Sequence, residues 1–170
     1  MHCEGAARQQ GQDTGGFTLP EVIAVVVILG VLAALGVPSL LSLWDQYKVD
    51  QALAQVHGAL RETQAIAISK GKSCTISIPK GIHQTLVGSC LVTGDRNLGE
   101  VEIDHLRPSP WVVTFNYKGQ NRSPSNDPGT LWLSLPNDTV QPRCLTLSVG
   151  IGLMRTGNYD PLATPQCQTD

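Results

Sequence analysis

Gly15-Gly16-Phe17-Thr18-Leu19-Pro20-Glu21 precedes a run without charged side chains that extends from Val22 to Trp44. The run is 23 residues long. As an α-helix it would span roughly 35 Å at about 1.5 Å per residue, enough to cross a hydrocarbon core of about 30 Å. One carboxylate, that of Glu21, stands at its start. An isolated charge near lipid is costly unless it has a partner, so this acid is not explained by a simple membrane anchor.

These residues resemble the amino-terminal signal of type IV pilins and type II secretion pseudopilins, through Gly16 to Glu21 and the long apolar helix that follows. The resemblance implies that a prepilin peptidase cuts between Gly16 and Phe17 and methylates the new amine of Phe17. It implies that Glu21 then pairs with the amine of a neighbouring subunit. Gly30 and Pro38 stand where such proteins have residues that loosen the helix, so the resemblance implies a hinge there. The alternative is that glycine and proline are simply common in membrane helices.

A secretory signal peptide cleaved near Ala34-Leu35-Gly36, or a plain membrane anchor, is the competing interpretation. The apolar run is longer than the roughly 7–15 residues of a signal-peptide core. Residues 1–16 also lack a cationic segment, because Arg8 is balanced by Glu4 and Asp13. The orientation therefore rests on the resemblance, which implies a single pass through the bacterial inner membrane with the head outside the cytoplasm.

The composition fits one long helix and one modest domain within 170 residues. A net charge of −2 gives no general nucleic-acid signal. The 17 glycines and 11 prolines are typical of a turn-rich β domain. We expect four parts: a cleaved leader (1–16), a transmembrane and assembly half of the helix (17–44), an amphipathic half (45–71) and a β-rich head (72–170).

An amphipathic helix is predicted from Asp45 to Lys70, with Gly71 as its stop. Joined to the apolar run, it would make a continuous rod of roughly 80 Å. Its apolar stripe recurs at helical spacing. The stripe consists of Val49, Leu53, Val56, Leu60 and Ala67.

Six short strands are predicted after the helix, where apolar residues alternate between turn signals. They lie at 74–78, 85–92, 101–106, 111–118, 131–135 and 145–151. The fold class is therefore α+β, with a long amino-terminal helix packed on an antiparallel sheet or β-sandwich head. The run from Phe115 to Gly150 is similar to the carboxyl-terminal half of GspH/FimT-type minor pseudopilins and minor pilins. Their usual Gly-Arg ending is absent, since Gly150 is followed by Ile151.

Four cysteines follow the apolar run, and Cys3 lies in the leader. The four are Cys74, Cys90, Cys144 and Cys167. An even number outside the cytoplasm favours disulfides, for which three pairings exist. Local closure favours Cys74 with Cys90 and Cys144 with Cys167, each closing a loop worth on the order of 3 kcal/mol. A zinc site is the rival, but the sequence has no Cys-x-x-Cys or paired histidines, so no metal is expected.

His57, His83 and His105 are isolated in the sequence. No serine or cysteine nucleophile accompanies them in a recognisable pattern, so we expect neither an enzyme nor a cofactor, and we expect these histidines at or near the surface. Arg143 and Arg155 could contact nucleic acid together with nearby basic residues. They are sparse and lack interleaved aromatic residues, so DNA is an unsupported partner.

The sequence thus predicts a structural subunit of a type II secretion pseudopilus or a type IV pilus. The resemblance implies four kinds of partner: the prepilin peptidase, other pilins or pseudopilins in a helical filament, an inner-membrane assembly platform, and membrane lipid before assembly. A DNA- or surface-binding tip subunit of a type IV pilus is the alternative. A membrane-tethered β domain that is never processed is a third interpretation.

Overall fold

A computed structural model describes residues 16–122 and 129–169, without the side chains of residues 35–38. The chain divides into two compact units, Met1–Ser39 and Leu40–Asp170, which are described separately. The helix α1 (Leu19–Ser69) contributes to both. In the first unit it is apolar and exposed. Among the described residues, no single helix has the length and composition of a membrane span. A bent pair of helical segments, Leu19–Ala34 and Ser39–Ser69, meets both criteria when the two are taken together.

The second half of α1 is stopped by Gly71 as the sequence predicts, because Gly71 adopts a left-handed conformation (φ 61°). The Gly71 N–H donates to the Ile68 carbonyl at 3.2 Å, and the Lys72 N–H donates to the Ala67 carbonyl at 3.1 Å. These two bonds form a Schellman motif, which satisfies carbonyl groups of the last turn. The helical residues stop at Ser69, one residue before the predicted end.

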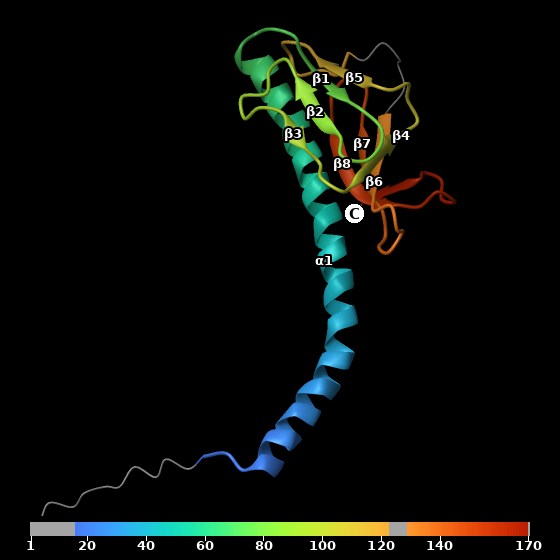
Figure 1. The fold of residues 1–170 in the computed structure, drawn as a ribbon. Helices are drawn as coiled ribbons and strands as arrows, with labels where there is room; N and C mark the ends of the chain where they lie inside the picture. Colours follow the sequence, from blue (N-terminus) through green and yellow to red (C-terminus); the bar gives the residue numbers. More distant parts are fainter. Residues whose placement is uncertain (1–15, 123–128, 170) are drawn as a thin grey trace, which may run out of the picture. The chain divides into compact units, whose positions relative to one another are not determined.

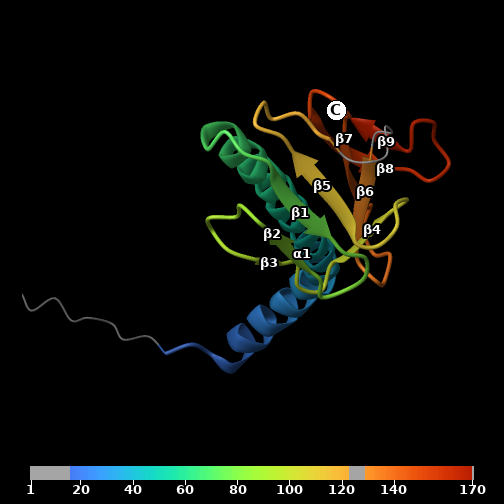
Figure 2. The same ribbon diagram turned by 90° about the horizontal axis from the view of Figure 1, so that it is seen from above.

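Within the described residues, nine antiparallel strands form two sheets beside this half of the helix (Figures 1 and 2). The first sheet has the order β3-β2-β1-β5. Its strands are β3 (Arg96–Asn97), β2 (Thr85–Gly88), β1 (Cys74–Ile78) and β5 (Trp111–Phe115). The second has the order β4-β6-β7-β8-β9. Its strands are β4 (Glu102–His105), β6 (Gly129–Ser134), β7 (Arg143–Leu147), β8 (Met154–Tyr159) and β9 (Cys167–Thr169).

The core lies between the helix and both sheets, which confirms the predicted α+β fold. One face of α1 is buried, and it includes Val49, Val56 and Leu60 of the predicted stripe. Three alanines on this face, Ala52, Ala59 and Ala67, are also buried. Leu53, by contrast, is only partly buried at the edge of the core. Side chains of β1, β5, β6 and β7 meet this face; they include Ile76, Val113, Phe115, Leu131, Leu133, Leu145 and Leu147.

The predicted strand at 145–151 is too long, and strands β3, β8 and β9 were not predicted. The ladder of β7 ends at Leu147, because the chain turns through Gly150 (φ 80°) and Gly152 (φ 67°). The Ser148 N–H donates to the Leu153 carbonyl at 2.9 Å and closes this turn. Ile151, which continued the alternation in the sequence, lies in the turn and is 71% exposed.

The two disulfides join Cys74 with Cys90 and Cys144 with Cys167. The second connects β7 to β9, although β8 lies between these strands in the sheet order. Gly157 of β8 makes this possible, because a Cβ atom at this position would overlap the backbone carbonyl of Gln168. The missing side chain therefore lets β9 pass close over β8 toward Cys144.

Candidate functional site

The amino-terminal motif folds into a helix cap. The Thr18 carbonyl accepts hydrogen bonds from the Glu21 N–H at 3.0 Å and the Val22 N–H at 3.2 Å, so Thr18 is the residue that caps the helix. Pro20 follows within the first turn, where a missing N–H costs nothing. The Glu21 carboxylate oxygen Oε2 lies 3.4 Å from the Thr18 N and 3.5 Å from its Oγ1. Thr-x-x-Glu is the sequence of a capping box, and the Glu21 side chain makes one of its two bonds, the one to the Thr18 N–H.

The contacts of Glu21 with Thr18 leave its carboxylate accessible to a cation. The two distances from Glu21 Oε2 to Thr18 are at the long end of hydrogen bonding, and both residues are exposed. Glu21 also lies in the first turn, where the helix dipole favours a negative charge. Phe17 is 81% exposed, and nothing lies within 4 Å of the position of a Cβ on Gly16. The predicted cleavage bond therefore lies in accessible chain just before the cap.

The large apolar side chains described from Val22 to Trp44 are each between 49% and 66% exposed. They surround the helix rather than forming one stripe, as expected of a helix whose surroundings are apolar. Gly30 lies in α1 with open space around it. The side chain of Pro38 lies outside the described residues, so the hinge at Gly30 and Pro38 stays a prediction.

Just beyond the apolar run, three polar contacts attach α1 to two loops and one strand of the head. The Thr139 hydroxyl donates to Asp45 Oδ2 at 3.1 Å. Lys48 Nζ lies 3.1 Å from Glu100 Oε2. The third contact joins the Arg143 guanidinium to Asp50. We call these three contacts the basal latches.

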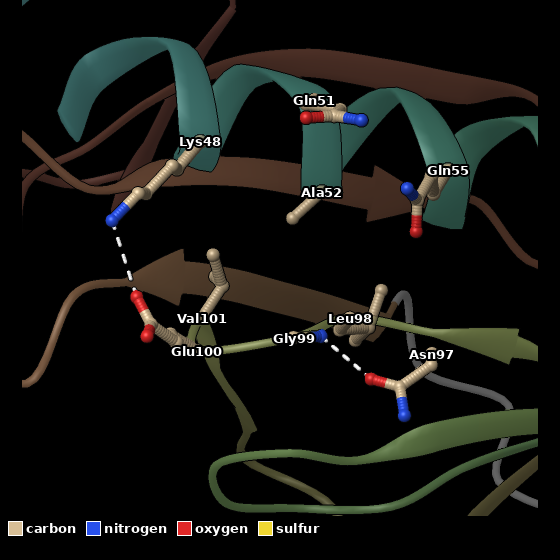
Figure 3. A pocket seen from close by; sticks show the side chains of 9 residues that line it. All are labelled: Lys48, Gln51, Ala52, Gln55, Asn97, Leu98, Gly99, Glu100 and Val101. Atoms are coloured by element: carbon tan, nitrogen blue, oxygen red, sulfur yellow. Dashed lines mark hydrogen bonds and ion pairs between the residues drawn. The ribbon is translucent and has the colours of Figure 1, made fainter. Parts of the chain in front are cut away.

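A shallow pocket of about 250 Å³ lies beside the Lys48–Glu100 latch (Figure 3). Lys48 reaches from the helix toward Glu100 on one side, and Asn97 accepts a hydrogen bond from the Gly99 N–H at 2.7 Å on the other. The apolar side chains of Ala52, Leu98 and Val101 line the space between them. The pocket lining mixes these apolar groups with the amides of Gln51 and Gln55, and it contains a single ion pair.

Glu62 organises the loop between β2 and β3. Its carboxylate accepts hydrogen bonds from the Val92 N–H at 2.7 Å and from the Thr93 N–H and hydroxyl at 3.1 and 2.9 Å. It also pairs with the Arg96 guanidinium at 2.7 Å. Burial alone would raise the pKa of Glu62, but the bonds from Thr93, Val92 and Arg96 outweigh it and lower the pKa to about 2.

Arg143 and Arg155, the candidate nucleic-acid contacts, are not brought together. In the β7–β8 ladder Arg143 lies opposite Asn158, and Arg155 lies opposite Thr146. Positions 143 and 146 of one strand face opposite sides of the sheet, so the two arginines do as well. Arg143 is engaged with Asp50 and Asn158. A basic patch built on this pair is therefore not formed.

His105 is fully buried, which corrects the expectation of a surface position. Its Nε2 lies 3.1 Å from the Ile78 carbonyl, and its Nδ1 accepts from the Arg107 N–H at 3.3 Å. Its ring also packs against Trp111, with centroids 5.6 Å apart. Burial lowers the pKa of His105. Sequence spacing gave no sign of this role, which depends on the pairing of distant strands.

In the part of the chain that the structure describes, no three His, Cys, Asp or Glu side chains gather into a metal site.

The amino-terminal motif and the fold are each similar to those of known proteins. The prokaryotic N-terminal methylation motif matches residues 12–37. Over 47 residues the chain is 51% identical to the type II secretion system core protein G of Pseudomonas aeruginosa, a match that covers 28% of this chain and 33% of that protein. The chain thus spans about a third of the length of this curated relative. The fold aligns with the crystal structure of the Pseudomonas aeruginosa type IV minor pilin FimU at a TM-score of 0.52 and 16% identity, over 68% of this chain and 90% of that one.

The chain thus combines a methylation motif at the start of a long helix with a head of antiparallel sheets. The motif match, the similarity to protein G and the shared fold support the resemblance to type IV pilins and type II secretion pseudopilins found in the sequence. The likeness to FimU concerns the fold.

Proposed function

We propose that this chain is a minor pilin or pseudopilin, a structural and non-enzymatic subunit of a type II secretion pseudopilus or a type IV pilus. One observation carries the proposal: the methylation motif spans the capped start of an apolar helix, and that helix continues into an α+β head with the fold of a minor pilin. The membrane segment, the processing signal and the head are thus combined in one chain.

The first step is processing by a prepilin peptidase. The bond between Gly16 and Phe17 precedes the Thr18 cap, and Phe17 is exposed. Cleavage there releases residues 1–16 and leaves an amine on Phe17, which the same enzyme methylates.

The second step is pairing between subunits inside the filament. The amine of Phe17 carries a positive charge, and Glu21 of a neighbouring subunit supplies the negative one. Because the helix surface is apolar from Val22 to Trp44, the pair would be enclosed by apolar side chains. Leaving one charge of a buried pair without its partner costs about 3–5 kcal/mol, so the pair fixes the axial register of the subunits.

Before assembly, the apolar half of α1 holds the subunit in the bacterial inner membrane as a single pass, with the head outside the cytoplasm. The two disulfides suit an oxidising compartment. An inner-membrane assembly platform then transfers the subunit from lipid to the filament, where the helices of other pilins or pseudopilins cover the same apolar side chains. Membrane lipid is thus a partner only until assembly.

Glu21→Ala tests the proposal, with Thr18→Ala as the matched control. Thr18→Ala removes only the hydroxyl contact of the cap and keeps the carboxylate. We expect Glu21→Ala to be cut after Gly16 and methylated on Phe17, as read by mass spectrometry, yet to be missing from the sheared filament fraction. Thr18→Ala should be processed and incorporated. Normal incorporation of Glu21→Ala would refute the register argument, and an intact amino terminus or a cut near Gly36 would refute the proposed processing.

A further inference from the structure

Two large aromatic side chains are exposed on α1, one at the end of the apolar run and one in the turn after it. Trp44 is 61% exposed and Tyr47 is 57% exposed. They are three residues apart on one face of α1, and their ring centroids lie 6.0 Å apart. Both belong to the compact unit that contains the head, and the head does not cover them.

The basal latches begin immediately after Trp44. Asp45, the next residue, accepts a hydrogen bond from Thr139, and Lys48 pairs with Glu100. No linker therefore separates the charge-free run from the head. Wherever the run leaves the bilayer, the loops of the head that carry Glu100 and Thr139 must lie within about two helical turns of that point.

The chemistry of the two rings fits the boundary between acyl chains and headgroups. Tryptophan and tyrosine gather at this level because each has an apolar ring and a polar N–H or O–H group. The number of residues before Trp44 fits this position. An α-helix of the length from Val22 to Leu43 rises roughly 33 Å, close to the hydrocarbon thickness of about 30 Å.

We propose that Trp44 and Tyr47 bind the headgroup boundary of the phospholipid bilayer before assembly and hold the base of the head against the membrane surface. This inference rests on the proposed function, because it takes the apolar half of α1 as the membrane segment. The occupant of the aromatic face is phospholipid rather than a second copy of the chain.

Tryptophan fluorescence of the full chain in phospholipid vesicles tests the inference. The signal of Trp44 is the difference between the wild-type chain and Trp44→Phe. The vesicles contain lipid brominated near the headgroup end, in the middle or at the tail end of the acyl chain. We expect bromine near the headgroup to quench the Trp44 signal about twofold more strongly than bromine at the tail end. Trp132→Phe is the matched control, because it removes a tryptophan of the head and should leave this pattern unchanged.

Three outcomes would overturn the inference. Trp44 could be quenched by aqueous iodide and by none of the brominated lipids. It could be quenched most strongly from the tail end. Its quenching by lipid could fall as the ratio of protein to lipid rises, which would show that a second copy covers the aromatic face. Extraction with alkaline carbonate separates these failures from that of the proposed function. Release of the chain from the membrane by carbonate would contradict both the proposed function and this inference. A chain that stays in the membrane but has Trp44 away from the headgroup boundary would contradict only this inference.

Discussion

Arg143 of β7 places its guanidinium Nε 2.7 Å from Oδ1 of Asp50 on α1. The two residues are 93 positions apart, so their ion pair ties the second sheet to the helix at the base of the head. Their side chains are 27% and 42% exposed, respectively, so solvent screens part of the attraction.

A double-mutant cycle with Asp50→Ala and Arg143→Ala should give a coupling energy of about 1 kcal/mol. Thermal unfolding of the detergent-solubilised chain, followed by near-ultraviolet circular dichroism, measures it. The Lys48–Glu100 pair is the comparison, and its coupling should be smaller because Glu100 is 70% exposed. Equal coupling for the two pairs would show that burial of the Arg143–Asp50 pair adds nothing.

The Glu62 cluster should make the head sensitive to acid. The pKa of Glu62 is lowered to about 2 in the folded chain from an ordinary value of 4.5. The unfolded chain therefore takes up a proton first, so the stabilisation is complete above about pH 4.5 and is lost as the pH falls toward 2. Glu62→Gln should flatten the dependence of the unfolding midpoint on pH in this window, while Glu102→Gln should leave this contribution in place.

Glu62→Gln should also destabilise the head at neutral pH. The amide cannot accept the charge-assisted bonds that the carboxylate accepts from Arg96, Thr93 and Val92. A loss of about 2 kcal/mol is expected from hydrogen bonds to a charged group. Hydrogen exchange at the Val92 and Thr93 amides should speed up in this variant. Unchanged protection of both amides would contradict the role given to Glu62.

His105 should contribute a second dependence on pH, in a different window. Burial lowers the pKa of the folded-state imidazole below its ordinary value of 6.5. Below about pH 6.5 the unfolded chain therefore binds more protons, and the free energy of unfolding falls as the pH drops from 6.5 toward the folded-state pKa. His105→Gln should remove part of this slope. An unchanged slope in the His105→Gln variant would contradict the role given to the buried imidazole.

Gly157→Ala should disturb the second disulfide. The new methyl group would meet the Gln168 carbonyl and displace β9, at a cost of about 1–3 kcal/mol. We expect a larger fraction of free thiol at Cys144 and Cys167, measured by alkylation and mass spectrometry, with Cys74 and Cys90 still paired. Gly30→Ala, at a position with open space, is the control. Full pairing of Cys144 with Cys167 in the Gly157 variant would contradict the close passage of β9.

Local signals made the helix and most of the head predictable. Gly71 marked the end of α1, and the alternation at Cys74 to Ile78 marked β1. The Thr18–Glu21 cap was also readable as Thr-x-x-Glu, although it was not predicted. Strand β8 could not be recognised, because Met-Arg-Thr-Gly-Asn-Tyr has no apolar alternation. The burial of His105 and the latch between Arg143 and Asp50 depend on the register of strands far apart in sequence, which no local pattern encodes.

The helix cap at Thr18 has one more consequence. Because the helical hydrogen bonds begin at the Thr18 carbonyl, neither Gly16 nor Phe17 contributes to them. An enzyme that severs the chain between these two residues acts on non-helical backbone and need not unwind any turn of α1. If the chain is cut there as proposed, the precursor and its trimmed product would share the same helix start, and Glu21 would keep its position on the first turn.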